Sequence, residues 1–237
     1  MRIACAAALA VSVCCRAASA GALQVAPVNL QVTGTGGATA LQLTNGGAQP
    51  LVAQIRVFRW SQTNGVETLE PTDAVVASPP AATLPPHAQY TVRVVRLDPT
   101  PVVGEESYRL IVDELPDANR ARNGAINMVL RYSVPLFFTE PSASQPRLAW
   151  SLRRGKGGRL VASAVNEGQR HLRLSEMTIR AGGAKAAFGE GLVGYVLGKS
   201  SMSFSSKNVA GAPGAGSASI SANTDMGRLD AIAPLGK

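Results

Sequence analysis

The sequence contains very little cysteine and histidine, and this scarcity excludes several kinds of site. Cys5, Cys14 and Cys15 are its only cysteines, and all three lie in the first twenty residues. If that segment is removed, no disulfide and no thiolate site remains. The two histidines, His87 and His171, are far apart in the sequence, which excludes a zinc site. We expect neither a metal nor another cofactor.

Motifs of catalysis are missing as well. No G-x-S-x-G sequence occurs. The segment 194–200 has its first glycine one residue too close to match a phosphate-binding loop, and the segment 34–37 lacks the third glycine of a dinucleotide-binding fingerprint. Both histidines stand among polar residues, which indicates solvated side chains rather than a general base. The sequence therefore predicts no enzyme and no small-molecule substrate.

The N-terminus has the pattern of a signal peptide. Arg2 precedes an apolar run over 3–13, and Ala18-Ser19-Ala20 offers a cleavage site. The run is too short to span a bilayer, and no comparable run follows. A lipoprotein is the lesser alternative, because the residues before Cys14 and Cys15 fit a lipobox poorly. We expect a mature protein that begins near Gly21 and is secreted across the inner membrane.

Basic residues exceed acidic ones, 23 against 15, which gives a formal net charge of +8. Removal of Arg2 and Arg16 with the signal peptide lowers this to about +6. A moderately basic surface favours partners that carry carboxylates. Because the basic residues are scattered, with no run of five, we do not expect nucleic acid as a partner.

Alternation with period two dominates the first 140 residues, which predicts an all-β sandwich. Leu23 and Val25 begin an edge-like strand before Pro27, and Asn45-Gly46 and Asn64-Gly65 predict tight turns. The strongest further strand candidates are Ala40–Thr44, Leu51–Trp60, Tyr90–Leu97, Tyr108–Leu115 and Ile126–Phe138.

The segment 141–146 interrupts this pattern and predicts a linker between two domains, 21–140 and 147–237, after a signal peptide over 1–20. The second domain has a weaker pattern, with strands expected over 147–152, 159–166, 172–179 and 192–197. Its Gly-, Ala- and Ser-rich stretch over 209–219 predicts a mobile loop.

One strand, Ile126–Val134, has an apolar face formed by alternate residues. Ile126, Met128, Leu130, Tyr132 and Val134 share this face, and Asn127, Val129, Arg131 and Ser133 share the other. The pattern alone does not distinguish a half-buried sandwich strand from a binding strand.

Several motifs along the first domain resemble the periplasmic chaperones of the chaperone-usher pathway, which assemble pili. They are Ser78-Pro-Pro80, Leu84-Pro-Pro86, Thr91-Val-Arg93-Val, Tyr108-Arg109 with Glu114-Leu-Pro116, and the strand Ile126–Phe138. The runs 57–62 and 130–135 are most similar to the archaic, Csu-type branch. In the second domain, Asn166-Glu-Gly168 and Gly194-Tyr-Val-Leu197 are weaker matches.

The resemblance implies two immunoglobulin-like β-sandwich domains at an angle, and a function in donor-strand complementation. In that mode the chaperone supplies the strand that a pilin subunit lacks, and later releases the subunit to an outer-membrane usher. The donor side chains implied are Ile126, Met128 and Leu130, with Tyr132 and Val134 extending the row. The exposed edge of such a strand also invites self-association of the free form.

The family grips the C-terminal carboxylate of its subunit with two basic residues, and both are replaced here. Asn29 and Pro135 stand at these positions. The resemblance leaves Asn29, Arg131 and Arg93 as possible anchors. The family's charge link between domains also looks incomplete, because Glu114 and Asp225 match its acidic positions while Thr139 stands near the missing basic one.

Other classes of protein fit less well. A secreted adhesin or carbohydrate-binding module usually has aromatic clusters or acidic calcium loops, but aromatic residues make up only 5% of this chain. A pilin subunit has a single domain, and a secreted enzyme needs a catalytic cluster. The adhesin remains the main alternative.

Overall fold

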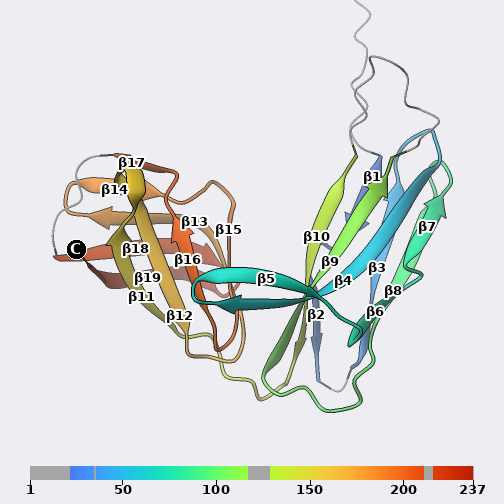
Figure 1. Cartoon of the computed structure of the whole chain (residues 1–237), viewed down its shortest axis with the longest axis horizontal. Helices are drawn as coiled ribbons and strands as arrows, with labels where there is room; N and C mark the ends of the chain where they lie inside the picture. Colours follow the sequence, from blue (N-terminus) through green and yellow to red (C-terminus); the bar gives the residue numbers. More distant parts are fainter. Residues whose placement is uncertain (1–21, 35, 117–128, 211–215, 237) are drawn as a thin grey trace, which may run out of the picture.

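The structure, a computed structural model, describes residues 22–34, 36–116, 129–210 and 216–236. These residues form two all-β lobes set at an angle, and residues 140–147 connect them (Figure 1). The predicted fold class, two β-sandwiches at an angle, is confirmed.

The first lobe packs two sheets face to face. One sheet has the order β1-β3-β8-β6, with β1 (Leu23–Ala26), β3 (Ala38–Asn45), β8 (Gln89–Arg96) and β6 (Val75–Ser78). The other has the order β2-β10-β9-β4-β5, with β7 beside β4. Its strands are β2 (Leu30–Thr33), β10 (Arg131–Thr139), β9 (Glu105–Leu115), β4 (Leu51–Thr63), β5 (Val66–Pro71) and β7 (Ala81–Leu84).

Period-two alternation builds the core of this lobe, as expected of strands with one buried face. On β9, Tyr108, Leu110 and Val112 point inward and are fully buried, while Arg109 between them points outward. Leu41 and Leu43 of β3 meet them from the facing sheet, within one cluster of buried side chains. The core therefore fixes which residues of each strand remain available to a partner.

The N-terminal segment crosses from one sheet to the other. β1 pairs with β3, whereas β2 runs parallel to β10 and pairs with it only over Leu136–Thr139. The crossing is made by a bend over Pro27–Asn29, where proline offers no N–H to a ladder. As a result, β2 covers only the lower part of β10.

The second lobe is one extended sheet folded over its own core, in the order β16-β12-β11-β19-β18-β13-β14-β17, with β15 beside β13. Its strands are β11 (Leu148–Arg154), β12 (Leu160–Asn166), β13 (Leu172–Ala181), β14 (Ala184–Ala187), β15 (Leu192–Val196), β16 (Ser201–Ser205), β17 (Asn208–Ala210), β18 (Gly216–Thr224) and β19 (Gly227–Leu235).

The structure corrects one sequence prediction and adds detail to others. The mobile loop expected over 209–219 is wrong at both ends, because β17 covers 209–210 and β18 begins at Gly216. Between the motifs Ser78-Pro-Pro80 and Leu84-Pro-Pro86 the structure also has a short strand, β7, that the sequence pattern did not indicate. The predicted strand Ile126–Phe138 corresponds to β10 from Arg131 onward, and 126–128 lie outside the described residues.

The far half of β4 and β5 form a hairpin that leaves the first lobe and reaches the second (Figure 1). We call residues 60–67 the arm. Its turn is the predicted Asn64-Gly65 pair, with φ of 54° and 82°. At the tip, Gly65 accepts a hydrogen bond from Ser203 N at 3.1 Å. The arm therefore docks on β16 of the other lobe.

Candidate functional site

The upper part of β10 presents a strand edge that no described strand covers. β10 pairs with β9 along its whole length, from Arg131 opposite Asp113 to Thr139 opposite Glu105. On its other side, β2 begins only at the level of Leu136. Within the described residues, the backbone of 131–135 thus has a strand partner on one side only. Such an edge is a template for pairing with another strand.

The apolar row predicted for this strand continues into the core of the lobe. Val134 is 2% exposed, and Leu130 and Tyr132 are half-buried against the same core. Tyr132 also donates a hydrogen bond from its hydroxyl to Leu23 O at 2.7 Å. Ile126 and Met128, the other two members, lie outside the described residues. The row therefore starts inside the lobe and runs up along the open edge.

The outward face at this edge carries two arginines around one aspartate. Arg56 Nη2 lies 2.7 Å from Asp113 Oδ2, and Arg131 pairs with Asp113 Oδ1. Burial alone would raise the pKa of Asp113, but hydrogen bonds and charges from Arg131 and Arg56 lower it below its usual value. The Arg131 side chain remains 67% exposed. A partner carboxylate at Arg131 would have to compete with Asp113.

The other two predicted anchors lie elsewhere in the first lobe. Asn29 is exposed in the bend that leads into β2. Arg93 lies on β8, between Ala40 of β3 and Ser78 of β6, and points away from the core. Arg131 points outward from the opposite sheet. The structure therefore does not bring Arg131 and Arg93 into one site.

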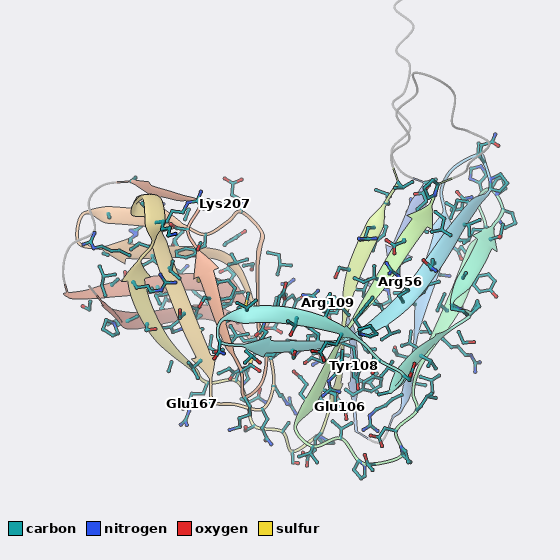
Figure 2. All side chains as sticks on the ribbon, in the orientation of Figure 1. Arg56, Glu106, Tyr108, Arg109, Glu167 and Lys207 are labelled. Carbon is teal, nitrogen blue, oxygen red and sulfur yellow. The ribbon has the colours of Figure 1, made fainter. Side chains whose placement is uncertain are left out.

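Sequence reasoning missed a further cation, Arg109, where the two lobes meet (Figure 2). It lies directly opposite Pro135 in the β9–β10 register. Its guanidinium carbon is 3.7 Å from the ring centre of Trp60 and 5.2 Å from that of Tyr195 in the second lobe. The sequence did point to this residue, since Arg109 belongs to the Tyr108-Arg109 motif of the family.

Arg109 forms no ion pair within the described residues. The ion pairs among the described residues of this lobe use Arg56, Arg59, Arg96 and Arg131 instead. Burial lowers the pKa of Arg109, and the nearby Glu67 carboxylate opposes this. An arginine nevertheless remains charged at neutral pH, because its normal pKa is above 12. The site therefore offers a half-buried guanidinium to an anion.

Aromatic and polar contacts hold the lobes together around Arg109. Trp60, Phe137, Tyr195 and Leu197 form a buried cluster from both lobes. Beside it, the buried amide of Gln62 on the arm donates to Tyr195 O and accepts from Leu197 N, both at 2.9 Å. A side chain thus takes the place of a strand neighbour for β15.

Polar side chains link the lobes around His171; Asp225 and Thr139 take part as the sequence suggested, and Glu105 takes the place expected for Glu114. His171 Nδ1 and its backbone N both lie 2.8 Å from Glu105 Oε1, and Thr139 Oγ1 donates to Glu105 Oε2 at 3.0 Å. His171 Nε2 is 3.7 Å from Asp225 Oδ2. Glu114, predicted for the acidic position, instead lies higher on β9 opposite Ala53.

The interpretation of His171 as a solvated side chain is wrong. Its side chain is 4% exposed and stacks on Phe137, with ring centres 3.5 Å apart. His87 is exposed, as expected. The polar residues beside it in the sequence suggested exposure, whereas His171 is buried between the lobes.

The residues that the structure describes include neither a metal-binding cluster nor a membrane-spanning helix. They contain no group of three or more His, Cys, Asp or Glu side chains that could hold a metal ion. Within the same residues, no helix is both long and apolar enough to cross a membrane.

Comparison with known proteins identifies the family. The sequence pattern of the pili and flagellar-assembly chaperone family, PapD N-terminal domain, matches residues 22–144, which is more than half of the chain. A search of curated proteins found no match. Among solved structures, the complex of the CsuC chaperone with the tip adhesion subunit CsuE, from archaic Csu pili of Acinetobacter baumannii, matches with 25% identity and a TM-score of 0.70. The match covers 91% of this chain and 99% of the other.

Two more distant structures share the fold. The complex of the SafA pilin with the SafB chaperone from Salmonella enterica matches at 17% identity and a TM-score of 0.61, over 91% of this chain and 98% of the other. The YadV chaperone matches at 14% identity and a TM-score of 0.62, over 89% and 99%. The predicted resemblance to the archaic branch is confirmed, and the chain belongs to the family of pilus-assembly chaperones.

Proposed function

We propose that this chaperone captures pilin subunits in the periplasm by lending them β10 as a missing strand, and releases them to an outer-membrane usher. The observation that carries the proposal is the open edge of β10 over 131–135, beside an apolar row that emerges from the core. Strand addition to an exposed edge uses backbone hydrogen bonds for affinity and alternate side chains for specificity. The relatives CsuC and SafB were solved with subunits of this kind.

The side chains of the apolar row pack in two places, the core of the chaperone and the groove of the subunit. Val134 and Tyr132 stay in the chaperone core, and Leu130 stands at its boundary. Met128 and Ile126, further along the same row, are the side chains proposed to enter the groove of the subunit. A buried side chain of this size stabilises a complex by about 1.5 to 3 kcal/mol. The flexible thioether of Met128 suits clients with differently shaped pockets.

We further propose that Arg109 anchors the C-terminal carboxylate of the subunit. The resemblance implies a carboxylate at the junction of the lobes, next to the lower end of the donor strand. Arg109 lies opposite Pro135, so it approaches the place of the missing basic residue from the neighbouring strand. Stacking on Trp60 orients the guanidinium plane and leaves its edge donors for a bidentate contact. Asn29 and Arg131 remain candidates for a second contact.

The experiment that tests the strand proposal is co-expression of the C-terminally tagged chaperone with the small secreted β proteins encoded beside its gene. We expect a one-to-one periplasmic complex that protects the partner from proteolysis. Ile126→Glu with Met128→Glu should abolish capture. The control is Val165→Glu, which places the same change on an exposed apolar residue of β12.

Either result is informative. Unchanged capture by the folded double variant would contradict the assignment of β10 as the donor strand. If the neighbouring proteins accumulate equally well without this chain and none copurifies, the adhesin alternative takes precedence and glycan binding becomes the next assay.

A further inference from the structure

The two lobes differ sharply in charge. Residues 147–236 contain 12 Lys and Arg against 5 Asp and Glu, whereas residues 22–146 contain 8 against 10. The excess of positive charge in the second lobe gathers at one end, in three segments without any acidic residue: 148–162, 178–187 and 204–210. We call six of their exposed cations the distal basic patch. Its members are Arg153, Lys156, Arg159, Arg180, Lys185 and Lys207.

Strand register brings these cations together. Arg159 adjoins Leu160, whose carbonyl accepts from Ser206 N at 2.8 Å, so Lys207 lies next to this turn. Lys207 N in turn donates to Ala187 O at 2.9 Å, at the end of β14. Along β14, Lys185 lies directly opposite Arg180 of β13. The patch therefore spans the β11–β12 turn, the start of β17 and the β13–β14 hairpin.

The patch has no internal charge compensation. The ion pairs among described residues of this lobe use Arg147, His171 and Arg228 instead. Two like charges placed directly opposite on neighbouring strands, as Arg180 and Lys185 are, destabilise a sheet. Glu176, the acidic residue of these two strands, lies four positions before Arg180 and accepts a hydrogen bond from Asn223. A partner that supplies negative charge would therefore relieve the repulsion between Arg180 and Lys185.

The surroundings of the patch favour a surface of phosphate groups over a protein. Stable protein interfaces depend on aromatic or other large anchors. The two aromatic residues of these segments, Trp150 and Phe204, are buried in the core of the lobe. One large apolar side chain, Ile232, is exposed nearby. Ser219 of β18 lies between it and Arg180, paired with Ile232 on one side and with Arg180 on the other. Long, flexible Lys and Arg side chains among Gly, Ala and Ser suit electrostatic attraction to a charged surface better than a shape-complementary protein interface.

We infer that the distal basic patch docks the chaperone on the headgroups of an anionic phospholipid membrane. Each Lys or Arg held near such a surface strengthens binding by about 5-fold. Strands β14 and β17 lie along the upper edge of the second lobe, and Lys207 lies at the same edge, above the arm (Figures 1 and 2). Docking there leaves the open edge of β10 free, so a membrane-bound chaperone could still hold a client.

The test is sedimentation of the purified protein with phosphatidylglycerol vesicles and with phosphatidylcholine vesicles, at low and at high salt. We expect binding to the anionic vesicles only, and loss of binding at high salt because exposed charges are screened. Lys156→Glu with Arg159→Glu should weaken binding by at least about 25-fold, two factors of about 5. Arg93→Glu with Arg147→Glu makes the same change in net charge outside the patch and should weaken it far less.

Three results would overturn the inference. The first is no binding of the purified protein to anionic vesicles at low salt. The second is an equal loss in both double variants, which would assign the effect to net charge. The third is tight binding to polyglutamate without binding to vesicles, which would assign the patch to an acidic protein partner. Circular dichroism of all variants verifies that the fold is retained.

Discussion

Arg109, the side chain proposed to anchor the subunit, lies where the two lobes meet. It is held by Trp60 from its own lobe and lies near Tyr195 from the other, so its position depends on both lobes being in place. The guanidinium is half-buried and is not matched by an ion pair among the described residues. A charged group in such a place interacts strongly with an anion, because little water screens the pair.

We expect Arg109→Gln to weaken binding of a subunit by about 10- to 100-fold, the usual effect of losing a hydrogen bond to a charged group. The measurement is isothermal titration with a peptide that ends in the C-terminal strand of the subunit. An amide at the end of that peptide should lower its affinity for the unaltered chaperone and leave the affinity of the variant unchanged. Arg93→Gln serves as a matched control. If the amide lowers the affinity of the variant as much as that of the unaltered chaperone, Arg109 does not contact the carboxylate.

At the scale of elements, the arm joins the lobes through non-covalent contacts, in addition to the chain segment 140–147 that connects them. Its tip fits because Gly65 has no side chain, and a Cβ there would collide with Ser203 Oγ. Gly65 also adopts a φ of 82°, which favours glycine on its own account. Gln62 then completes the backbone hydrogen bonding of β15.

Replacing Gly65 with alanine should loosen the arm from the second lobe. Gly227→Ala is the matched control, because Gly227 also has positive φ but no atom within 4 Å of an added Cβ. Both variants should lose about 1 kcal/mol of unfolding free energy through backbone strain. Only Gly65→Ala should also speed proteolysis at the arm and widen the particle in small-angle scattering. Equal behaviour of the two variants would contradict docking by the arm.

Strands with large apolar residues were predictable, but those with small ones were not. β9 and β4 follow from Leu, Ile, Val and Tyr at period two. On β18, the buried residues are Ala218, Ile220 and Ala222. Alanine differs too little from serine in hydrophobicity for its alternation to stand out, so this strand was mistaken for part of a loop.

The site was predictable in part, for a different reason. The apolar row from Ile126 is visible in the sequence. The open edge beside it depends on where β1 leaves one sheet and β2 joins the other, which is a matter of three-dimensional pairing. The same holds for Arg109 and His171, whose partners are distant in the sequence.

For the whole molecule, stability in acid depends on a charged network at the lower end of the first lobe. Arg96 holds Glu106 through two hydrogen bonds of 2.9 and 2.7 Å, and the Tyr108 hydroxyl donates to Glu106 at 2.9 Å. Burial alone would raise the pKa of Glu106, but these contacts lower it below its usual value. Burial and the Glu106 carboxylate raise the pKa of Tyr108 to about 12.

A carboxyl group whose pKa is lowered by folding stabilises the protein above its unfolded pKa, about 4.3 for Glu. This contribution is lost as the pH falls through the lowered value in the folded state. We therefore expect Glu106→Gln to be less stable than the unaltered protein at pH 7, with a difference that shrinks below about pH 4. Urea unfolding between pH 3 and 7 measures this. A difference that stays constant with pH would mean that the loss comes from packing and not from charge.

The continuity of the apolar row with the core of the first lobe has a thermodynamic consequence. Leu130, Tyr132 and Val134 belong to the interior that keeps this lobe folded, and they also form the root of the proposed donor strand. A ligand that binds the folded form alone raises the melting temperature of the part it binds. The client and the first lobe would therefore melt together, each protecting the other against heat, and release at the usher would return both to their separate stabilities.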